Sequence, residues 1–279
     1  MLQFELERLK HKDVRQRRMA VRRLFEIDDP SSLVAFIELL EVDDDWFVEK
    51  AIDAIRRWVD SSHRKEVVML SVRSEVRLRH LAAELAPRVG AEALPILSTL
   101  CSDSENSIRR EAWKSRLKVD AGTIPVAIEN EDHVIRKMAT SHSGDTDILE
   151  RMLSDEHLRV REAALNQMMS LGHSPALLNQ FLDGPLRNKA AKLRFPLLIE
   201  SGETSTIARL CTNPDSAMRN LIAKNLNDVD WLSWNDVVDA ARESTDPLLL
   251  PQLLCSRREP EADVIRHDLL LNGRPSSRA

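Results

Sequence analysis

The fold of this chain is decided by residues 149–172, which read LERMLSDEHLRVREAALNQMMSLG. Asp155 in this stretch precedes the pair Val160-Arg161, apolar residues follow at helical spacing, and the stretch ends at Gly172. An acid before a helix accepts hydrogen bonds from the free N–H groups of its first turn, and a glycine just past a helix suits the left-handed conformation found there. The stretch therefore predicts two helices joined by a short acidic turn, a first helix (A) and a second helix (B).

The apolar-Arg pair of this stretch recurs along the chain. Successive copies lie 25 to 34 residues apart, and the other copies are Val14-Arg15, Val48-Glu49 with the charge reversed, Val76-Arg77, Ile108-Arg109, Ile135-Arg136, Leu186-Arg187 and Met218-Arg219. A ninth, weaker copy lies at Asp246-Pro247-Leu248. Repeats of this length are typical of solenoids, in which stacked helix pairs bury the apolar faces that a single pair leaves exposed.

The repeat predicts an all-α fold, an α-solenoid of eight or nine stacked antiparallel helix pairs. We expect one domain over residues 1–271, closed by a C-terminal helix at about 261–271, and a flexible tail at 272–279. Glycines that fall at one phase of the repeat are expected to end helices, and these are Gly90, Gly122, Gly144, Gly172 and Gly202.

Composition agrees with this reading and excludes other classes. The 279 residues include only 7 glycines, few for phosphate-binding α/β folds or β-barrels, and 40 Lys+Arg stand against 45 Asp+Glu, for a net charge of -5. A generally basic nucleic-acid-binding protein is therefore excluded. The 3 cysteines form no CxxC pair, and no apolar run approaches the ~20 residues of a membrane span. We expect a cytoplasmic protein without a membrane segment.

The repeat resembles the HEAT-repeat superfamily, in its short variant of about 30 residues as found in bilin-lyase-type HEAT proteins. The resemblance rests on residues 149–172, on LPILSTLCSDSENSIRREAWKSRLKVDAG at 94–122 and on IARLCTNPDSAMRNLIAKNL at 207–226. It implies a superhelix whose B helices line a concave surface. Members of this superfamily are mostly scaffolds, with enzymes as exceptions.

Basic residues on the B helices are the candidate binding residues. They are Arg15, Arg18, Arg77, Arg79, Arg109, Arg110, Lys114, Arg136, Lys137, Arg161, Arg187, Lys189 and Arg219. Arginine near a helix N-terminus is disfavoured by the macrodipole, so a compensating interaction is expected. Two interpretations stay open: the arginines bond acids in neighbouring turns and join repeat to repeat, or they form an anion-binding column on the concave face.

The N-terminus is strongly polarised. Residues 1–25 carry eight Lys and Arg against three acids, whereas residues 24–49 carry nine acids and no Lys or Arg before Lys50. Such charge blocks often mark interaction surfaces. The alternative is a capping repeat, whose outer face is polar for solubility.

No catalytic or metal-binding pattern stands out, so we predict a non-enzymatic protein-protein interaction scaffold without cofactor or metal. Its partner is expected to be an acidic or helical protein segment. Nucleic-acid binding is the alternative, including a weak likeness of Val238-Asp239, after Trp231 and Trp234, to HEAT-like DNA-repair glycosylases, and a lyase-like or chaperone-like accessory role is a third. Trp58 and Trp113 are expected in the core, and Trp46 is expected to be partly exposed.

Overall fold

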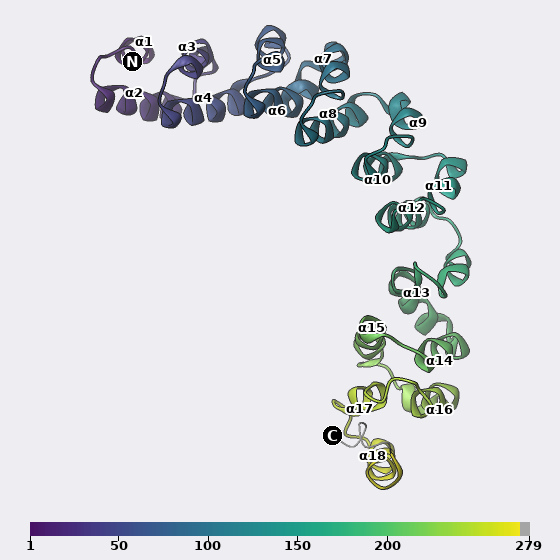
Figure 1. Ribbon diagram of the computed structural model, residues 1–279. Coiled ribbons are helices and arrows are strands. Elements are labelled where there is room, and N and C mark those ends of the chain that lie inside the picture. Colours follow the sequence, from purple (N-terminus) through teal and green to yellow (C-terminus); the bar gives the residue numbers. More distant parts are fainter. Residues whose placement is uncertain (274–279) are drawn as a thin grey trace. The chain divides into compact units, whose positions relative to one another are not determined.

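The computed structural model describes residues 1–273, except for the side chains of residues 91 and 92. In this part of the chain every regular secondary-structure element is a helix, and there are no strands (Figure 1). Its contacts divide the chain into two compact units, Met1–Ser143 (unit 1) and Gly144–Ala279 (unit 2). The described residues form nine successive helix pairs, five in unit 1 and four in unit 2, which confirms the predicted all-α solenoid. A single domain over residues 1–271 stays a prediction, and most of the predicted tail lies outside the described residues.

Unit 1 is built in two layers, with the A elements on one side and the B helices on the other (Figure 1). The A elements are α1 (Leu2–Arg8), η1 (Pro30–Ser32) with α3 (Leu33–Glu38) and η2 (Leu39–Glu41), α5 (Arg64–Ser71), η3 (Ala86–Glu92) with α7 (Ala93–Leu100), and η4 (Ala121–Thr123) with α9 (Ile124–Ala127). The B helices are α2 (Val14–Ile27), α4 (Asp45–Trp58), α6 (Val76–Leu85), α8 (Asn106–Val119) and α10 (His133–His142). Each B helix contacts the next along the unit, as a solenoid requires.

Unit 2 continues the same alternation. Its pairs are α11 (Thr146–Met152) with α12 (Leu158–Ser170), η5 (Pro175–Phe181) with α13 (Arg187–Ser201), α14 (Thr204–Thr212) with α15 (Ser216–Leu226), and η6 (Trp231–Ser233) and α16 (Asn235–Arg242) with α17 (Leu249–Leu254). The predicted C-terminal helix is α18 (Pro260–Asn272), which packs against α17.

The third residue of a B helix sets the register of the repeat, because in most pairs it is an apolar side chain buried in the core. These residues are Phe47, Leu78, Ile108, Ile135, Val160 and Met218, and all are at most 2% exposed. Val14 and Val76 are instead exposed first residues of their helices. The first and third repeats therefore align two residues later than the sequence pattern indicates, so that Arg17 and Arg79, and not Arg15 and Arg77, correspond to Arg109.

Helix ends agree with the predicted chemistry in part. Asp13, Asp44, Asp132 and Asp215 accept hydrogen bonds from first-turn N–H groups of their B helices. Three of the five predicted helix-ending glycines, Gly90, Gly172 and Gly202, have positive φ. The left-handed conformation expected at such glycines is absent at Gly122 and Gly144, because the chain already leaves the preceding helix in extended conformation at Asp120 and Ser143.

Candidate functional site

Four arginines at the fourth position of their B helices share one geometry, and we call them the clamp arginines. Each donates Nη1 hydrogen bonds to the backbone carbonyls six and five residues earlier, in the turn that precedes its own helix. Arg79 reaches the carbonyls of Arg73 and Ser74, and Arg109 reaches those of Asp103 and Ser104, at 2.6 to 3.0 Å. Two further clamps follow the same rule: Arg136 to Asn130 and Glu131, and Arg161 to Asp155 and Glu156. Turn carbonyls that lack helical partners are satisfied in this way.

Other arginine contacts join one helix pair to the next, and we call these contacts the ladder pairs. Arg79 forms a two-pronged contact with Asp103 at 2.7 and 3.1 Å, and Arg110 forms the same contact with Asp132 at 2.6 and 3.2 Å. Arg219 binds Asp246 at 2.6 Å. Two parallel N–H···O bonds to a carboxylate are the strongest common ion-pair geometry. Each ladder pair fixes a B helix against the turn of the following pair.

The ladder carboxylates are electrostatically stabilised. Hydrogen bonds from Arg79 hold the pKa of Asp103 below its usual value. Burial alone would raise the pKa of Asp132, but hydrogen bonds from Arg110 and from the N–H of Val134 lower it further than burial raises it. Both carboxylates are therefore ionised in the folded protein at neutral pH.

The other candidate residues differ in whether their charged groups form hydrogen bonds or ion pairs. Arg77 pairs with Asp45 and Glu49 of α4 at 3.5 and 3.3 Å, and Lys114 pairs with Glu111 on its own helix at 3.0 Å. Arg187 donates to the carbonyls of Asn213 and Leu210. Arg15, Lys137 and Lys189 form no side-chain hydrogen bond or ion pair within the described part of the chain.

Exposed cations gather on the first B helix. Arg15, Arg18 and Arg22, which we call the α2 basic face, are exposed and lie at positions i, i+3 and i+7, so they share one side of α2. Among the described residues Arg15 and Arg22 have no side-chain partner, and Arg18 reaches Asp44 only at 3.5 Å. The guanidinium of Arg18 also lies 5.0 Å from the ring centre of Trp46.

Sequence reasoning missed Arg22, although its spacing from Arg15 and Arg18 was a usable signal. The structure thus reduces the number of residues in the predicted basic column that are available to bind a partner. The clamp arginines and ladder pairs use six of its thirteen members internally, whereas the α2 basic face keeps its charges toward solvent.

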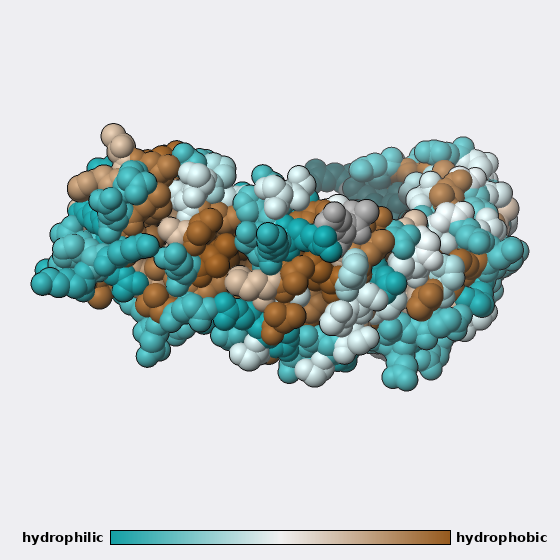
Figure 2. All heavy atoms as spheres, turned by 90° about the horizontal axis from the view of Figure 1, so that it is seen from above, coloured by the Kyte–Doolittle hydropathy of each residue, from teal (hydrophilic) through white to brown (hydrophobic). Residues whose placement is uncertain are grey.

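The surface formed by the A elements of unit 1 carries exposed apolar side chains. Figure 2 shows brown apolar side chains among teal polar ones on the side of α1, α3, α5 and α7. Phe4, Val34 and Val72 are among the exposed apolar side chains there. The candidate cations on α2 belong to the other layer.

The tryptophans are mostly core residues. Trp58 and Trp113 are buried, as predicted, and Trp46 is partly exposed, as predicted. Trp231 is fully buried and Trp234 is half-buried, whereas Asp239 is exposed. The segment that resembled a repair glycosylase therefore places Trp231 in the core of unit 2, where it cannot stack on a base.

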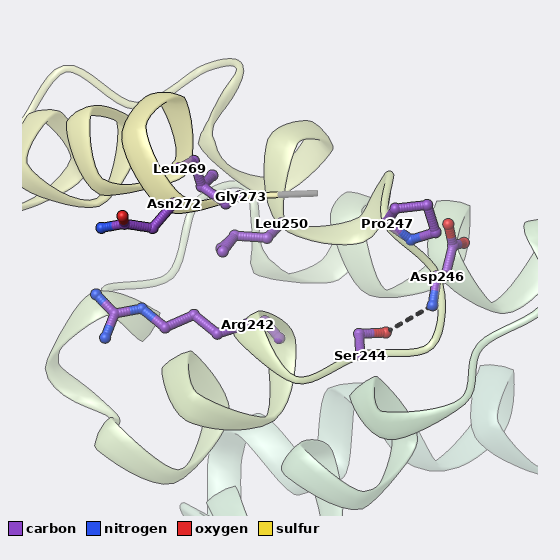
Figure 3. A pocket seen from close by; sticks show the side chains of 9 residues that line it. Arg242, Ser244, Asp246, Pro247, Leu250, Leu269, Asn272 and Gly273 are labelled. Atoms are coloured by element: carbon purple, nitrogen blue, oxygen red, sulfur yellow. Dashed lines mark hydrogen bonds between the residues drawn. The ribbon is translucent and has the colours of Figure 1, made fainter. Parts of the chain in front are cut away.

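A small cavity of about 190 Å³ lies between α16, α17 and α18 (Figure 3). Arg242 of α16 and Asn272 of α18 extend their polar ends on the same side of it, and the N–H of Asp246 donates to Ser244 Oγ at 3.3 Å. The carboxylate of Asp246 is bound by Arg219, so this cavity offers one cation beside several apolar side chains.

The cysteine thiols and the possible metal-ligating side chains supply little further chemistry. Cys101, Cys211 and Cys255 are free, and burial raises the pKa of Cys101 to about 11 and that of Cys211 to about 12. Within residues 1–273, no group of three or more His, Cys, Asp and Glu is placed to hold a metal ion. In the same part of the chain, no helix has both the length and the apolar character that a bilayer crossing requires.

Comparison with known proteins adds no relative. No family model matches this chain, and a search of curated proteins likewise gives no significant match.

Proposed function

We propose that this protein is a non-enzymatic scaffold of the HEAT-like type that holds an acidic segment of another protein on its B layer. The observation that carries the proposal is the α2 basic face, where three guanidinium groups stay exposed, while the clamp arginines and the arginines of the ladder pairs in later repeats are bonded internally. Such a surface attracts carboxylates, and arginine offers them a planar pair of donors.

The spacing of the α2 basic face favours a helical partner segment. Arg15, Arg18 and Arg22 form a stripe about two turns long, and carboxylates at i, i+3 and i+7 of a facing helix would match it. Met19, exposed beside Arg18, and Trp46 supply apolar contact next to the charges. Charge attraction would speed the encounter, and these apolar contacts would slow dissociation.

We place this scaffold in the cytoplasm. Three free thiols, two of them buried in the cores of the helix pairs, suit a reducing compartment.

The test uses a fluorescent Glu/Ala helical peptide with carboxylates at i, i+3 and i+7. The variant Arg15→Gln/Arg18→Gln/Arg22→Gln is expected to bind it at least about tenfold more weakly than the parent protein, at about 0.15 M salt. The matched control removes three exposed cations elsewhere, in Lys118→Gln/Lys137→Gln/Lys192→Gln, and should bind within about twofold of the parent.

Equal loss in both variants would show a net-charge effect without a defined surface, which contradicts the proposal. Tighter binding of a single-stranded DNA oligonucleotide than of the peptide, with a steep salt dependence, would favour the nucleic-acid alternative instead.

A further inference from the structure

Arg17 departs from the clamp geometry of its counterparts. It is the fourth residue of α2, as Arg79, Arg109 and Arg161 are of their helices. Those arginines donate to the two turn carbonyls six and five residues earlier, but the Arg17 guanidinium donates no hydrogen bond to any described residue. Its Nε is buried and without a partner. The first repeat thus leaves unused a guanidinium that other repeats use.

The turn before Arg17 is basic, whereas the turns before Arg109 and Arg136 are acidic. Residues 102–105 read SDSE and residues 129–132 read ENED, whereas residues 10–13 read KHKD. His11 takes the role that Asp103 has before Arg109: its Nδ1 accepts the N–H of Asp13 at 3.0 Å, as Asp103 Oδ1 accepts that of Glu105 at 2.9 Å. The acidic side chains in the turns before Arg109 and Arg136 are therefore replaced here by Lys10, His11 and Lys12.

These cations line a cavity of about 380 Å³ between the α1–α2 turn and α3 with η2, which we call the turn-1 cavity. Its basic walls are Lys10, His11, Lys12 and Arg17, and its other walls are Leu9, Ala35, Glu38, Leu39 and Val42. Glu38 is the one acid among these lining residues, and its carboxylate lies 3.7 Å from the Lys10 ammonium in a pair that is largely exposed. Such a pair is weak in water and can be rearranged by a competing anion.

Arg17 is held in place for binding. Its guanidinium carbon lies 4.2 Å from the ring centre of Phe47, whose side chain is fully buried. Stacking on a ring occupies the face of the guanidinium and leaves the in-plane N–H groups of its outer edge available. A pre-positioned donor pair loses little entropy when it binds an oxyanion.

We propose that the turn-1 cavity is an oxyanion site that binds a phosphate group, with Arg17 as its fixed donor and Lys12, Lys10 and His11 around it. A phosphate monoester carries about two negative charges at neutral pH, which matches the two lysines and one arginine better than a single carboxylate does. The phosphate could come from a free phosphate compound or from a phosphorylated side chain, because both present the same three oxygens. The site is separate from the α2 basic face and does not depend on it.

The experiment titrates the full-length protein with inorganic phosphate at constant ionic strength and follows backbone amide chemical shifts. Saturable shifts are expected at residues 9–13 in the parent protein. Arg17→Gln should abolish saturation, and Lys12→Gln should weaken binding by about three- to tenfold. The control Arg15→Gln removes a cation from the same helix outside the cavity and should leave phosphate affinity unchanged.

Lys12→Gln tests the site without disturbing the fold. Lys12 is exposed and has no side-chain partner in the described residues, so its replacement leaves the packing intact. Unsaturable shifts, or equal affinity in the parent, Arg17→Gln and Lys12→Gln proteins, would overturn the proposal. A phosphoserine peptide that binds more tightly than inorganic phosphate would identify a phosphorylated side chain as the source, and equal affinity would identify a free phosphate compound. The α2 variant Arg15→Gln/Arg18→Gln/Arg22→Gln should keep phosphate binding, which separates this site from the scaffold function.

Discussion

At the residue scale, arginine serves three purposes in this protein. Arg109 satisfies carbonyls of its own turn, Arg110 binds a carboxylate of the next pair, and Arg15 is free in solvent. The sequence pattern assigned all three to one basic column, although Arg15 is the second residue of its helix, Arg109 the fourth and Arg110 the fifth. What separates them is which turn groups lie within reach, and that depends on the packing of neighbouring pairs.

The contact between Arg79 and Asp103 is a structural one, since both side chains are largely buried. Asp103→Asn is expected to lower the free energy of unfolding by about 1–3 kcal/mol, because the charge-assisted bonds weaken and Arg79 loses its counter-ion. Urea denaturation measures this, with the exposed Asp45→Asn as control. A change equal to that of the control would show that the contact is not a stabilising one.

The free energy of unfolding should also fall in acid, through the carboxylates of Asp103 and Asp28. The pKa of Asp103 is lowered in the folded state by hydrogen bonds from Arg79, and that of Asp28 by a hydrogen bond from Trp58 and then by Arg57. Their contribution is present above the unfolded pKa of about 3.9 and is lost as pH falls through the lower folded values. Urea unfolding from pH 7 down to about pH 3 measures the slope. The Asp103→Asn protein should show a shallower acid loss than the parent, and an identical slope would contradict the assignment.

At the element scale, a helix end requires glycine only where the backbone adopts the left-handed conformation. Gly202 closes α13 with φ of 68°, and the N–H of Glu203 bonds the carbonyl of Leu198 at 2.9 Å. Gly144 follows α10 without a positive φ, and the space that a Cβ would occupy there is open. The two glycines look alike in the sequence pattern but have different backbone requirements.

Gly202→Ala is therefore expected to destabilise the protein by about 1 kcal/mol, because alanine resists the left-handed conformation. Gly144→Ala should be neutral or slightly stabilising, since alanine has less freedom to lose on folding. Thermal unfolding of the two single variants makes the comparison. Equal destabilisation by both would mean that their backbone conformations do not differ as described.

Helix pairs and caps could be predicted from the sequence, because they depend on local spacing and on side chains adjacent to each helix. The register of the first and third repeats could not, because Val14 and Val76 satisfy the apolar-Arg pattern while lying outside the core. The η5 segment takes its place as an A element through packing against α13. In the candidate site, the sequence indicated the residue types and, as one interpretation, the kind of partner, an acid in a neighbouring turn. It could not indicate the individual pairs, because ladder pairs link residues 22 to 27 positions apart.

At the scale of the whole molecule, each helix pair depends mainly on its neighbours. Unit 1 has its own stack of five pairs, with B helices in contact from α2 to α10. In such a stack, removing distant pairs removes only one interface. We therefore expect one part of the stack to stay folded when the rest of the chain is removed.

A fragment of residues 1–143 is expected to fold alone, with a helical circular dichroism spectrum and cooperative urea unfolding. Its m value should be smaller than that of the full chain, because less surface is exposed on unfolding. A fragment without a cooperative transition would show that unit 1 needs unit 2 for its core.

The central claim is that the clamp and ladder arginines of later repeats hold the helix pairs together, whereas the exposed Arg15, Arg18 and Arg22 of α2 are available to bind a partner. Thermal unfolding of two triple variants tests it most directly: Arg79→Gln/Arg109→Gln/Arg110→Gln and Arg15→Gln/Arg18→Gln/Arg22→Gln. The first is expected to melt roughly 5–10 °C below the parent protein, and the second within about 2 °C of it. An α2 variant that melts as low as the other triple variant would contradict the account, because it would give both sets of arginines the same structural role.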